Sequence, residues 1–163
     1  MDKLITFAVP CYNSAAYMEH CVETLLQGGD DIEIILVDDG STDDTPAIAD
    51  RYAQEYPDIV QVIHQPNGGH GEGVNQGLRH ATGLYYKVVD SDDWLDADSL
   101  ARVLAQLRRF RDEGRELDLM ICNYVYEHVG IRPAMWCSIK MSFLRGRFSA
   151  GTTWANSGSP SIC

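Results

Sequence analysis

Three carboxylates stand within four residues of this chain, at Asp90, Asp92 and Asp93. Like charges at this spacing repel one another unless a cation compensates them. Magnesium and manganese prefer hard oxygen ligands, commonly one or two carboxylates completed by the phosphates of a substrate. The cluster therefore predicts a site for a divalent cation. A solvated turn that caps the following helix is the alternative interpretation.

A second polar cluster, residues 38–41, reads Asp-Asp-Gly-Ser. Aspartate and glycine favour tight turns, which is the simpler interpretation for Asp38. Asp39 is instead a candidate to accept a hydrogen bond from a base or a ribose. Tyr12 follows the proline that ends the first apolar run, and it either belongs to the core or presents its ring to a planar base.

Residues 67–73 read Asn-Gly-Gly-His-Gly-Glu-Gly and look like a loop that cradles a phosphate. Their glycines do not fit the G-x-G-x-x-G spacing, however, and the Walker lysine is absent. A loop histidine flanked by glycines is more often merely exposed than a ligand, and we interpret His70 in this way. The other four histidines show no ligand or triad spacing.

The elements that must position these clusters alternate between strands and helices. Apolar runs predict strands at residues 4–9, 32–37, 60–64, 84–89 and 117–125. Such alternation predicts an α/β fold, with a mostly parallel sheet that carries helices on both faces. Ligands of these sheets bind outside the carboxyl ends of the strands. The clusters at residues 10–13, 38–41 and 90–93 each follow a strand, so we expect them to meet in one site.

Four helices are predicted between these strands. The first is capped by Ser14, the second is capped within residues 42–44 and has Pro46 in its first turn, the third is a weaker glycine-rich helix at residues 71–81, and the fourth is capped by Asp98.

The chain has 163 residues, enough for one domain with a substantial core, and a formal net charge of −11. This charge argues against binding nucleic acid through its phosphates. No apolar run approaches the roughly 18 residues of a membrane span, and no secretory signal is visible. The five cysteines are scattered without a Cys-x-x-Cys pair, so neither a zinc site nor a disulfide framework is predicted. A cytoplasmic protein is the expectation.

The composition changes sharply after Glu127. All 24 acidic residues lie at or before it, whereas residues 128–163 hold four basic residues and no acidic one. From about residue 131 no helix or strand periodicity is sustained. We therefore expect a domain at residues 1–130 and an atypical tail at residues 131–163. Either the tail is a native basic segment, or the domain is truncated and the reading frame departs near residue 131.

Five motifs follow one another along the chain. They are Val9-Pro10-Cys11-Tyr12-Asn13, Val37-Asp38-Asp39-Gly40-Ser41-Thr42-Asp43, Asn67-Gly68-Gly69, Asn75-Gln76-Gly77 with Ala81-Thr82-Gly83, and Val89-Asp90-Ser91-Asp92-Asp93. In this order they resemble the family 2 glycosyltransferases of the GT-A fold, over roughly residues 4–126. The resemblance implies the nucleotide-sugar-binding portion of a transferase that moves a sugar, with inversion, from a UDP-sugar to an acceptor hydroxyl. It also implies a divalent cation, Mn²⁺ or Mg²⁺. The acceptor would be a saccharide or a lipid-linked glycan, the latter at the inner face of the membrane.

The resemblance implies a role for each matching residue. The nucleotide contacts are Pro10, Tyr12, Asn13, Asp39, Asn75, Asp90 and Ser91, and the metal contacts are Asp90, Asp92 and Asp93. Pro10 and Tyr12 would line the base pocket, and Asp39 would hydrogen-bond the base. The Asp-x-Asp element would hold the cation and the diphosphate. A bound cation stabilises the charge that builds on the leaving diphosphate, so no phosphate-binding lysine is required.

The chain departs from this family in two ways. Many relatives have Ala-Arg-Asn where residues 73–75 here read Gly-Val-Asn, which removes one cationic contact. Family members also continue into an acceptor-binding half that supplies a carboxylate base, but no acidic residue follows Glu127 here. The sequence therefore predicts a chain that binds donor but lacks a catalytic base in its tail. Core surface left exposed by a missing half would favour self-association.

Two other functions stay open. A module that binds nucleotide or donor without transferring sugar fits the missing base. A dinucleotide-dependent oxidoreductase shares the same alternation of elements, but Pro-Cys-Tyr-Asn follows the first strand in place of a glycine fingerprint.

Overall fold

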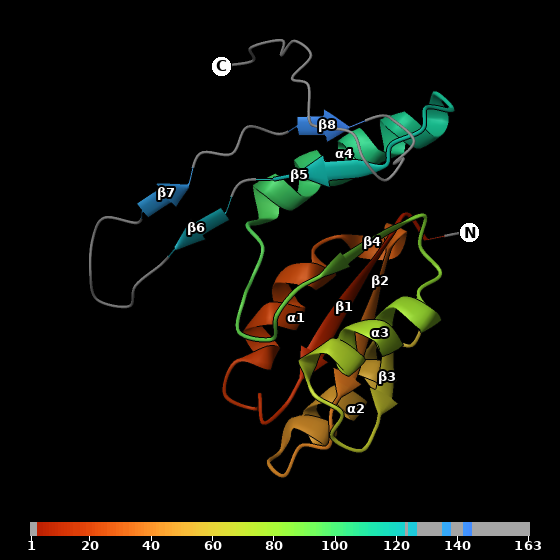
Figure 1. The fold of residues 1–163 in the computed structure, drawn as a ribbon. Coiled ribbons are helices and arrows are strands. Elements are labelled where there is room, and N and C mark those ends of the chain that lie inside the picture. Colours follow the sequence, from red (N-terminus) through yellow and green to blue (C-terminus); the bar gives the residue numbers. More distant parts are fainter. Residues whose placement is uncertain (1–2, 123, 127–134, 138–141, 145–163) are drawn as a thin grey trace, which may run out of the picture. The chain divides into compact units, whose positions relative to one another are not determined.

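The computed structural model describes residues 3–122, 124–126, 135–137 and 142–144. It divides the chain into two compact units, Met1–Arg109 and Phe110–Cys163. The first unit holds all the polar clusters identified in the sequence. Figure 1 shows its strands side by side, with helices packed around them.

A four-stranded sheet with the order β3-β2-β1-β4 forms the centre of the first unit. Its strands are β1 (Ile5–Cys11), β2 (Ile32–Asp38), β3 (Val60–His64) and β4 (Tyr85–Val88). All three neighbouring pairs run parallel, and Ile5 lies opposite both Ile32 and Tyr85. This arrangement confirms the parallel sheet predicted from the alternation of elements.

Helices connect the strands in the predicted order. They are α1 (Met18–Leu26), α2 (Thr45–Glu55), α3 (His70–His80) and α4 (Ala97–Asp112), with a short 3-10 helix η1 (Gly29–Asp31) before β2. Crossovers between parallel strands are right-handed, and the strand order reverses direction after β3. Helices α1 and α2 therefore lie on one face of the sheet. Helix α3, which crosses in front of the sheet in Figure 1, lies on the other.

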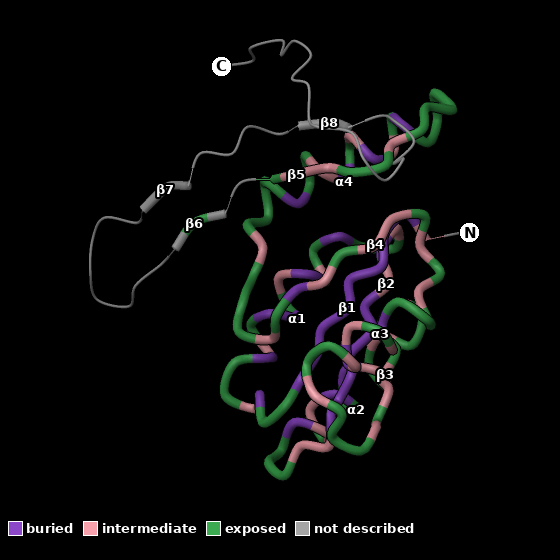
Figure 2. Tube along the Cα trace, in the orientation of Figure 1, coloured by how far each residue is buried: buried purple, intermediate pink, exposed green. Residues whose placement is uncertain are grey.

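The two central strands form the core of the first unit. Every residue of β1 is buried, and so is every residue of β2 except the half-buried Glu33. Both strands are largely purple in Figure 2, the colour of buried residues. Strands that are covered on both faces need near-continuous apolar sequence, which is why these two are the easiest to recognise in the chain. The edge strands β3 and β4 are partly exposed.

Helix α3 packs directly against β1 through two of its glycines. A Cβ added at Gly77 would lie 2.5 Å from the Cβ of Ala8, and one added at Gly73 would lie 3.1 Å from the Cβ of Pro10. Glycine weakens an isolated helix, which is why the sequence predicts only a weak helix here. In the folded protein the same glycines let α3 approach the strand that leads into the site.

The predicted cap at Ser14 is wrong. Helix α1 begins at Met18, and the backbone carbonyl of Ser14 accepts the N–H groups of Tyr17 and Met18. The hydroxyl of Ser14 bonds instead to the hydroxyl of Ser91, at 2.7 Å. A side chain that looks like a local cap has a partner 77 residues away, which spacing along the chain does not reveal.

The predicted cap at Asp98 is displaced by two residues. Helix α4 begins one residue before Asp98, and the carboxylate that serves its first turn belongs to Asp96, which accepts the N–H of Ser99 at 2.9 Å. Pro46 lies in the first turn of α2, as predicted.

The single strand predicted over residues 117–125 is also wrong. In the second unit this segment forms two short strands, β5 (Leu119–Ile121) and β6 (Tyr124–Tyr126). They pair antiparallel with β8 (Ser142–Leu144) and β7 (Met135–Cys137), respectively. Downstream segments of the chain thus supply local antiparallel partners, and strands of three residues are too short to produce a visible periodicity.

The domain boundary predicted near residue 130 lies outside the described residues, as does most of the predicted tail. The boundary therefore stays a prediction. Within the described part of the chain, no helix has both the length and the apolar character needed to cross a membrane.

Candidate functional site

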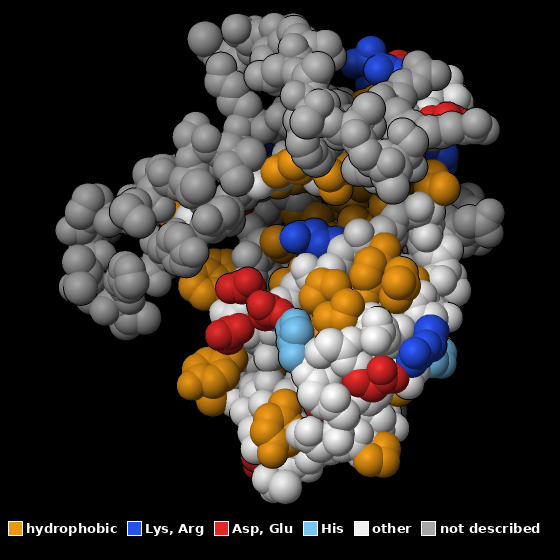
Figure 3. Space-filling view, in the orientation of Figure 1, with side chains coloured by type: hydrophobic (Ala, Val, Ile, Leu, Met, Phe, Trp, Pro, Cys, Tyr) orange, Lys and Arg blue, Asp and Glu red, His pale blue; other side chains and the backbone are white. Residues whose placement is uncertain are grey.

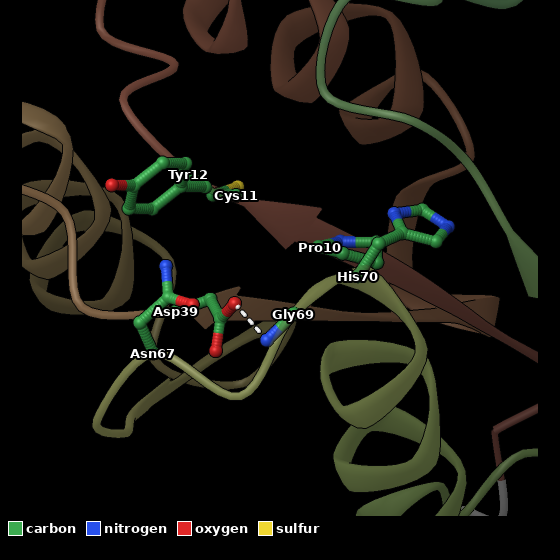
Figure 4. Close-up of a pocket in the computed structure, with 7 residues that line it drawn as sticks. All are labelled: Pro10, Cys11, Tyr12, Asp39, Asn67, Gly69 and His70. Atoms are coloured by element: carbon green, nitrogen blue, oxygen red, sulfur yellow. Dashed lines mark hydrogen bonds between the residues drawn. The ribbon is translucent and has the colours of Figure 1, made fainter.

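A pocket of about 300 Å³ opens at the carboxyl ends of β1 and β2. Its lining comes from the end of β1 and the residue after it, from the residue after β2, and from the loop before α3 and the first residue of that helix (Figure 4). The residues are Pro10, Cys11, Tyr12, Asp39, Asn67, Gly69 and His70. Two of the three polar clusters predicted to converge therefore meet in one pocket. The third reaches it through His70, as described below.

Asp39 is the most enclosed carboxylate of the pocket, with 3% of its surface exposed. Its Oδ1 accepts hydrogen bonds from Nε2 of Gln65 at 2.6 Å and from the N–H of Gly68 at 2.7 Å. Its Oδ2 accepts the N–H of Gly69 at 2.8 Å, the bond drawn in Figure 4. Burial alone would raise the pKa of Asp39, but these three bonds outweigh it and hold the pKa below the ordinary value.

The glycine-rich loop thus binds an anionic group, but that group is a carboxylate of the protein itself and not a phosphate. The N–H groups of Gly68 and Gly69 point at the Asp39 carboxylate. Gly40 makes this close approach possible. Its φ is +72°, and a Cβ added there would lie 2.8 Å from the backbone nitrogen of Asn67. A residue with a side chain would push the loop away from Asp39.

Asp38 has the turn role that the sequence suggests. Its Oδ1 accepts the N–H of Ser41 at 3.0 Å, which closes the turn after β2. Its Oδ2 lies 3.0 Å from Nδ1 of His64, and Nε2 of the same ring lies 3.0 Å from Oδ1 of Asp50. Hydrogen bonds to Asp38 and then to Asp50 raise the pKa of His64.

Sequence reasoning missed this role of His64. The signal lies in the sheet register, because Asp38 and His64 stand opposite each other in the pairing of β2 and β3. Nothing in the spacing of the two residues along the chain shows this pairing.

Tyr12 and Asn13 follow β1 but do different things. Tyr12 lines the pocket with 54% of its surface exposed, so it is accessible to a ligand and does not belong to the core. Asn13 has a φ of +50°, and its Oδ1 accepts the N–H of Thr42 at 2.8 Å. Its own N–H donates to Oγ of Ser41 at 3.0 Å. Asn13 therefore ties the end of β1 to the loop after β2 and is not among the lining residues.

The carboxylates after β4 are exposed and lack internal donors of this kind. The main chain of this segment is tied down: the N–H of Asp93 donates to the carbonyl of Asp90 at 2.9 Å, and the thiol of Cys21 donates to the same carbonyl at 3.6 Å. Ser91 is held by Ser14. Desolvation, followed by the charges of Asp92 and Asp90, raises the pKa of Asp93, the direction expected when like charges stand close together.

The donor chemistry of this cluster fits a divalent cation. No three His, Cys, Asp or Glu side chains in the described part of the chain gather into a ready-made metal site. Mg²⁺ and Mn²⁺ need only one or two carboxylates when substrate phosphates complete the shell. Asp90 and Asp92 would hold the cation together with a diphosphate, and Asp93 stands beside them.

Figure 3 shows acidic side chains gathered beside a histidine on the face in view. The structure pairs one histidine with an acidic residue of this cluster: Nε2 of His70 lies 3.7 Å from Oδ1 of Asp90. His70 is not a loop residue, as the sequence suggested, but the first residue of α3. It is exposed, as expected, and it also lines the pocket. The β3–α3 connection thereby brings the third cluster to the pocket.

Asn75 does not join the other candidate residues. It is exposed on α3, and its Nδ2 donates to Oε2 of Glu72 at 3.5 Å. It does not line the pocket described here.

The two buried cysteines near the site are not suited to ionise. Burial is the main cause that raises the pKa of Cys21 to about 12, and it also raises the pKa of Cys11 well above its ordinary value. Both thiols therefore stay protonated at neutral pH. A thiolate nucleophile or thiolate metal ligand at these positions is disfavoured.

Comparison with known proteins relates this fold to one family. Residues 6–150 match the model of the family described as glycosyl transferase family 2. Glycosyltransferase GlyG of Streptococcus pneumoniae serotype 4 is 39% identical over 126 residues, which are 76% of this chain and 40% of GlyG. EpsH of Bacillus subtilis is 41% identical over 124 residues, which are 76% of this chain and 34% of EpsH. This chain thus spans well under half the length of either relative.

Solved structures of glycosyltransferases are also similar to this chain. TarS 1–349 of S. aureus in complex with UDP-GlcNAc has a TM-score of 0.58 and 29% identity, over 66% of this chain and 32% of that one. The mannosyltransferase PcManGT from Pyrobaculum calidifontis, in complex with GDP-Man and Mn²⁺, has a TM-score of 0.56 and 31% identity, over 64% of this chain and 32% of that one. The parallel sheet, the pocket at its carboxyl edge and the family match have one common explanation: the chain belongs to glycosyl transferase family 2 and has the GT-A fold.

Proposed function

We propose that this chain binds a UDP-sugar together with a divalent cation and forms the donor-binding part of an inverting sugar transferase. The observation that carries the proposal is the pairing of two unlike regions in one site. An open pocket suited to a base is lined by Asp39 and Tyr12, and an exposed carboxylate cluster contacts the same pocket through His70. A nucleoside diphosphate has the same two parts, a flat base and a charged diphosphate.

At the base end, Tyr12 would stack on the base and Pro10 would form the pocket wall. A carboxylate offers about four lone-pair positions, and Asp39 uses three of them on internal donors. The remaining position on Oδ2 is free to accept a ring N–H of the base. Asn13, which braces the loop beside the pocket, would act on the nucleotide through that loop or its own exposed edge.

At the diphosphate end, Asp90 and Asp92 would hold the cation, with Asp93 alongside. When bound, the cation neutralises the charge that develops on the leaving diphosphate. Ser91 and Asn75 complete the proposed set of donor contacts. For Asn75 this requires its amide to leave Glu72. The solved structure of the neighbour PcManGT in complex with GDP-Man and Mn²⁺ supports the pairing of nucleotide sugar and cation.

The acceptor we propose is a hydroxyl of a saccharide or of a lipid-linked glycan, the latter at the inner face of the membrane. General-base catalysis of such a transfer is worth roughly 100- to 10,000-fold. Because residues 128–163 hold no acidic side chain, we propose that this chain binds donor but transfers sugar slowly. The same absence supports the second candidate function, a module that binds donor without transferring it.

A calorimetric panel of UDP, GDP, ATP and NAD, each in Mn²⁺ and in EDTA, tests the proposal. We expect UDP to bind most tightly and only with the cation. Equal UDP affinity in EDTA would refute the role of the cation, and preferred binding of NAD would refute the nucleotide-sugar site. Measuring UDP release from UDP-sugars with and without saccharide acceptors then separates the two functions. Acceptor-stimulated turnover near 1 per second, within the ordinary range of enzymes, would show that a base exists upstream.

A further inference from the structure

We propose that the imidazole of His70 is a ligand of the same divalent cation that Asp90 holds. The inference rests on the proposed function, and it assigns a nitrogen ligand to a site for which the sequence motifs supply only oxygen. It also makes His70 the residue that decides which cation this chain prefers.

The spacing of the two side chains fits this role. Nε2 of His70 lies 3.7 Å from Oδ1 of Asp90, which is longer than a hydrogen bond of about 3 Å. Two ligands with bonds of about 2.1 Å to one ion lie ~3 Å apart when adjacent and ~4.2 Å apart when opposite. The observed separation falls between these limits. Rotation of either exposed side chain by a fraction of an ångström at its tip therefore brings the pair to the spacing of two ligands of one ion.

The surroundings of His70 leave its ring available. Its side chain is 64% exposed, and that of Asp90 is 54% exposed. Glycines precede and follow His70, and a Cβ added at either Gly69 or Gly71 would meet nothing within 4 Å. Both side chains are therefore accessible from solvent, and the residues beside His70 carry no side chains that would crowd its ring.

Other histidines of the described residues have structural partners. His64 bridges Asp38 and Asp50. The Nδ1 of His80 lies 2.9 Å from the carbonyl of Gln76, within α3. Within the described part of the chain, the contact with Asp90 is the one polar side-chain contact found for His70. The fold thus holds His70 at the pocket without using its ring to stabilise the structure.

An imidazole ligand changes the selectivity of the site. Carboxylate and phosphate oxygens suit Mg²⁺ and Mn²⁺ alike, whereas imidazole nitrogen favours transition-metal ions. With His70 as a ligand, we expect UDP to bind more tightly in Mn²⁺ than in Mg²⁺. Without this ligand, the remaining oxygen ligands leave little difference between the two cations.

Pulsed electron paramagnetic resonance on the full chain with Mn²⁺ and UDP tests the assignment directly. A coordinated imidazole produces nitrogen modulation of the Mn²⁺ signal. We expect this modulation in the natural chain, its loss in His70→Gln, and its retention in the matched control His80→Gln, which alters a histidine at the other end of the same helix. Calorimetry should show the Mn²⁺ preference of UDP binding falling about tenfold in His70→Gln, as expected for a lost contact at a metal centre.

Each outcome of this experiment decides the question. A natural chain that binds Mn²⁺ and UDP without nitrogen modulation overturns the ligand role of His70, and this result needs no variant. Equal loss of UDP affinity in Mn²⁺ and in Mg²⁺ in His70→Gln, with no nitrogen signal, would assign the ring to the diphosphate instead. Failure of the natural chain to bind UDP with any cation would overturn the proposed function, and this inference with it.

Discussion

Two pairs of adjacent carboxylates stand at the same edge of one sheet but differ in burial and in hydrogen bonding. Asp38, which ends β2, and Asp39, which follows it, are buried, and their oxygens accept hydrogen bonds from donors of the protein itself. Asp92 and Asp93, after β4, are exposed, and their charges oppose each other. The first pair is held mainly by hydrogen bonds within the protein. The second pair is left to solvent.

The difference has a physical cause in the loops that follow the two strands. The turn after β2 lies against the loop after β3, whose N–H groups point into it. A carboxylate that accepts several N–H bonds is stabilised in its charged form. The segment after β4 is bound to the rest of the unit mainly through main-chain and hydroxyl groups, such as those of Asp90 and Ser91. Its carboxylates therefore stay exposed to solvent, where the proposed cation would reach them.

The largest effect is expected where the cation is proposed to bind. Replacing either Asp90 or Asp92 by Asn should lower UDP affinity in Mn²⁺ about 100-fold, or about 2.7 kcal/mol, because a charged oxygen ligand is lost. Folding should be unaffected, since both side chains are exposed. Calorimetry measures the affinity, and Asp58→Asn, at an exposed turn, is the matched control. An affinity within threefold of the natural chain would contradict the cation site.

At Asp39, unlike at Asp90 and Asp92, we expect a substitution to lower the stability of the fold. Asp39→Asn should lower the free energy of unfolding by about 1–3 kcal/mol. An amide NH2 would replace Oδ2 and face the N–H of Gly69, and the remaining amide oxygen, which is uncharged, would accept only from Gln65 and Gly68. Urea denaturation measures this loss, again against Asp58→Asn. Nucleotide affinity should fall as well, and by more than in Asp38→Asn, because Asp38 serves the turn. Unchanged stability in Asp39→Asn would remove the contrast between the two pairs.

A smaller effect is expected from His64, which supports Asp38. Its pKa is raised in the folded chain by Asp38 and Asp50. The stabilisation it provides is therefore complete below about pH 6.5, the ordinary histidine value, and is lost as the pH rises through the raised pKa. Because the ring is 44% exposed, the change should stay below about 1 kcal/mol. Urea denaturation between pH 5 and 9 should show this decline in the natural chain and in His80→Gln, and a flatter profile in His64→Gln. A decline that persists unchanged in His64→Gln would assign it to another group.

The smallest effect has the opposite sign. Asp93→Asn should raise the free energy of unfolding in EDTA by a few tenths of a kcal/mol, the scale of exposed charge interactions. The reason is that burial and the charges of Asp92 and Asp90 disfavour its ionised form. Thermal unfolding in low salt measures this gain, and high salt should reduce it. A loss of stability in EDTA would mean that the cluster is satisfied internally, like Asp39.

Much of this molecule follows from local features of the sequence. Apolar runs located the four parallel strands, and the polar residues that end three of them marked the edge where the pocket lies. The strands of a parallel sheet all end at one edge, so the clusters had to converge. The repulsion around Asp93 could also be predicted, because it depends only on neighbours in the chain.

Only the tertiary structure decided which groups partner one another across the site. Asp39 takes its donors from residues 26 to 30 positions away, and the hydroxyl of Ser14 goes to Ser91 rather than to a helix end. The register of β2 and β3 pairs His64 with Asp38, and the start of α3 brings His70 to Asp90. Periodicity and composition record which residues face inward, but they carry no distances between elements. Distances between elements are what distinguish a carboxylate that accepts hydrogen bonds within the protein, such as Asp39, from an exposed one, such as Asp92.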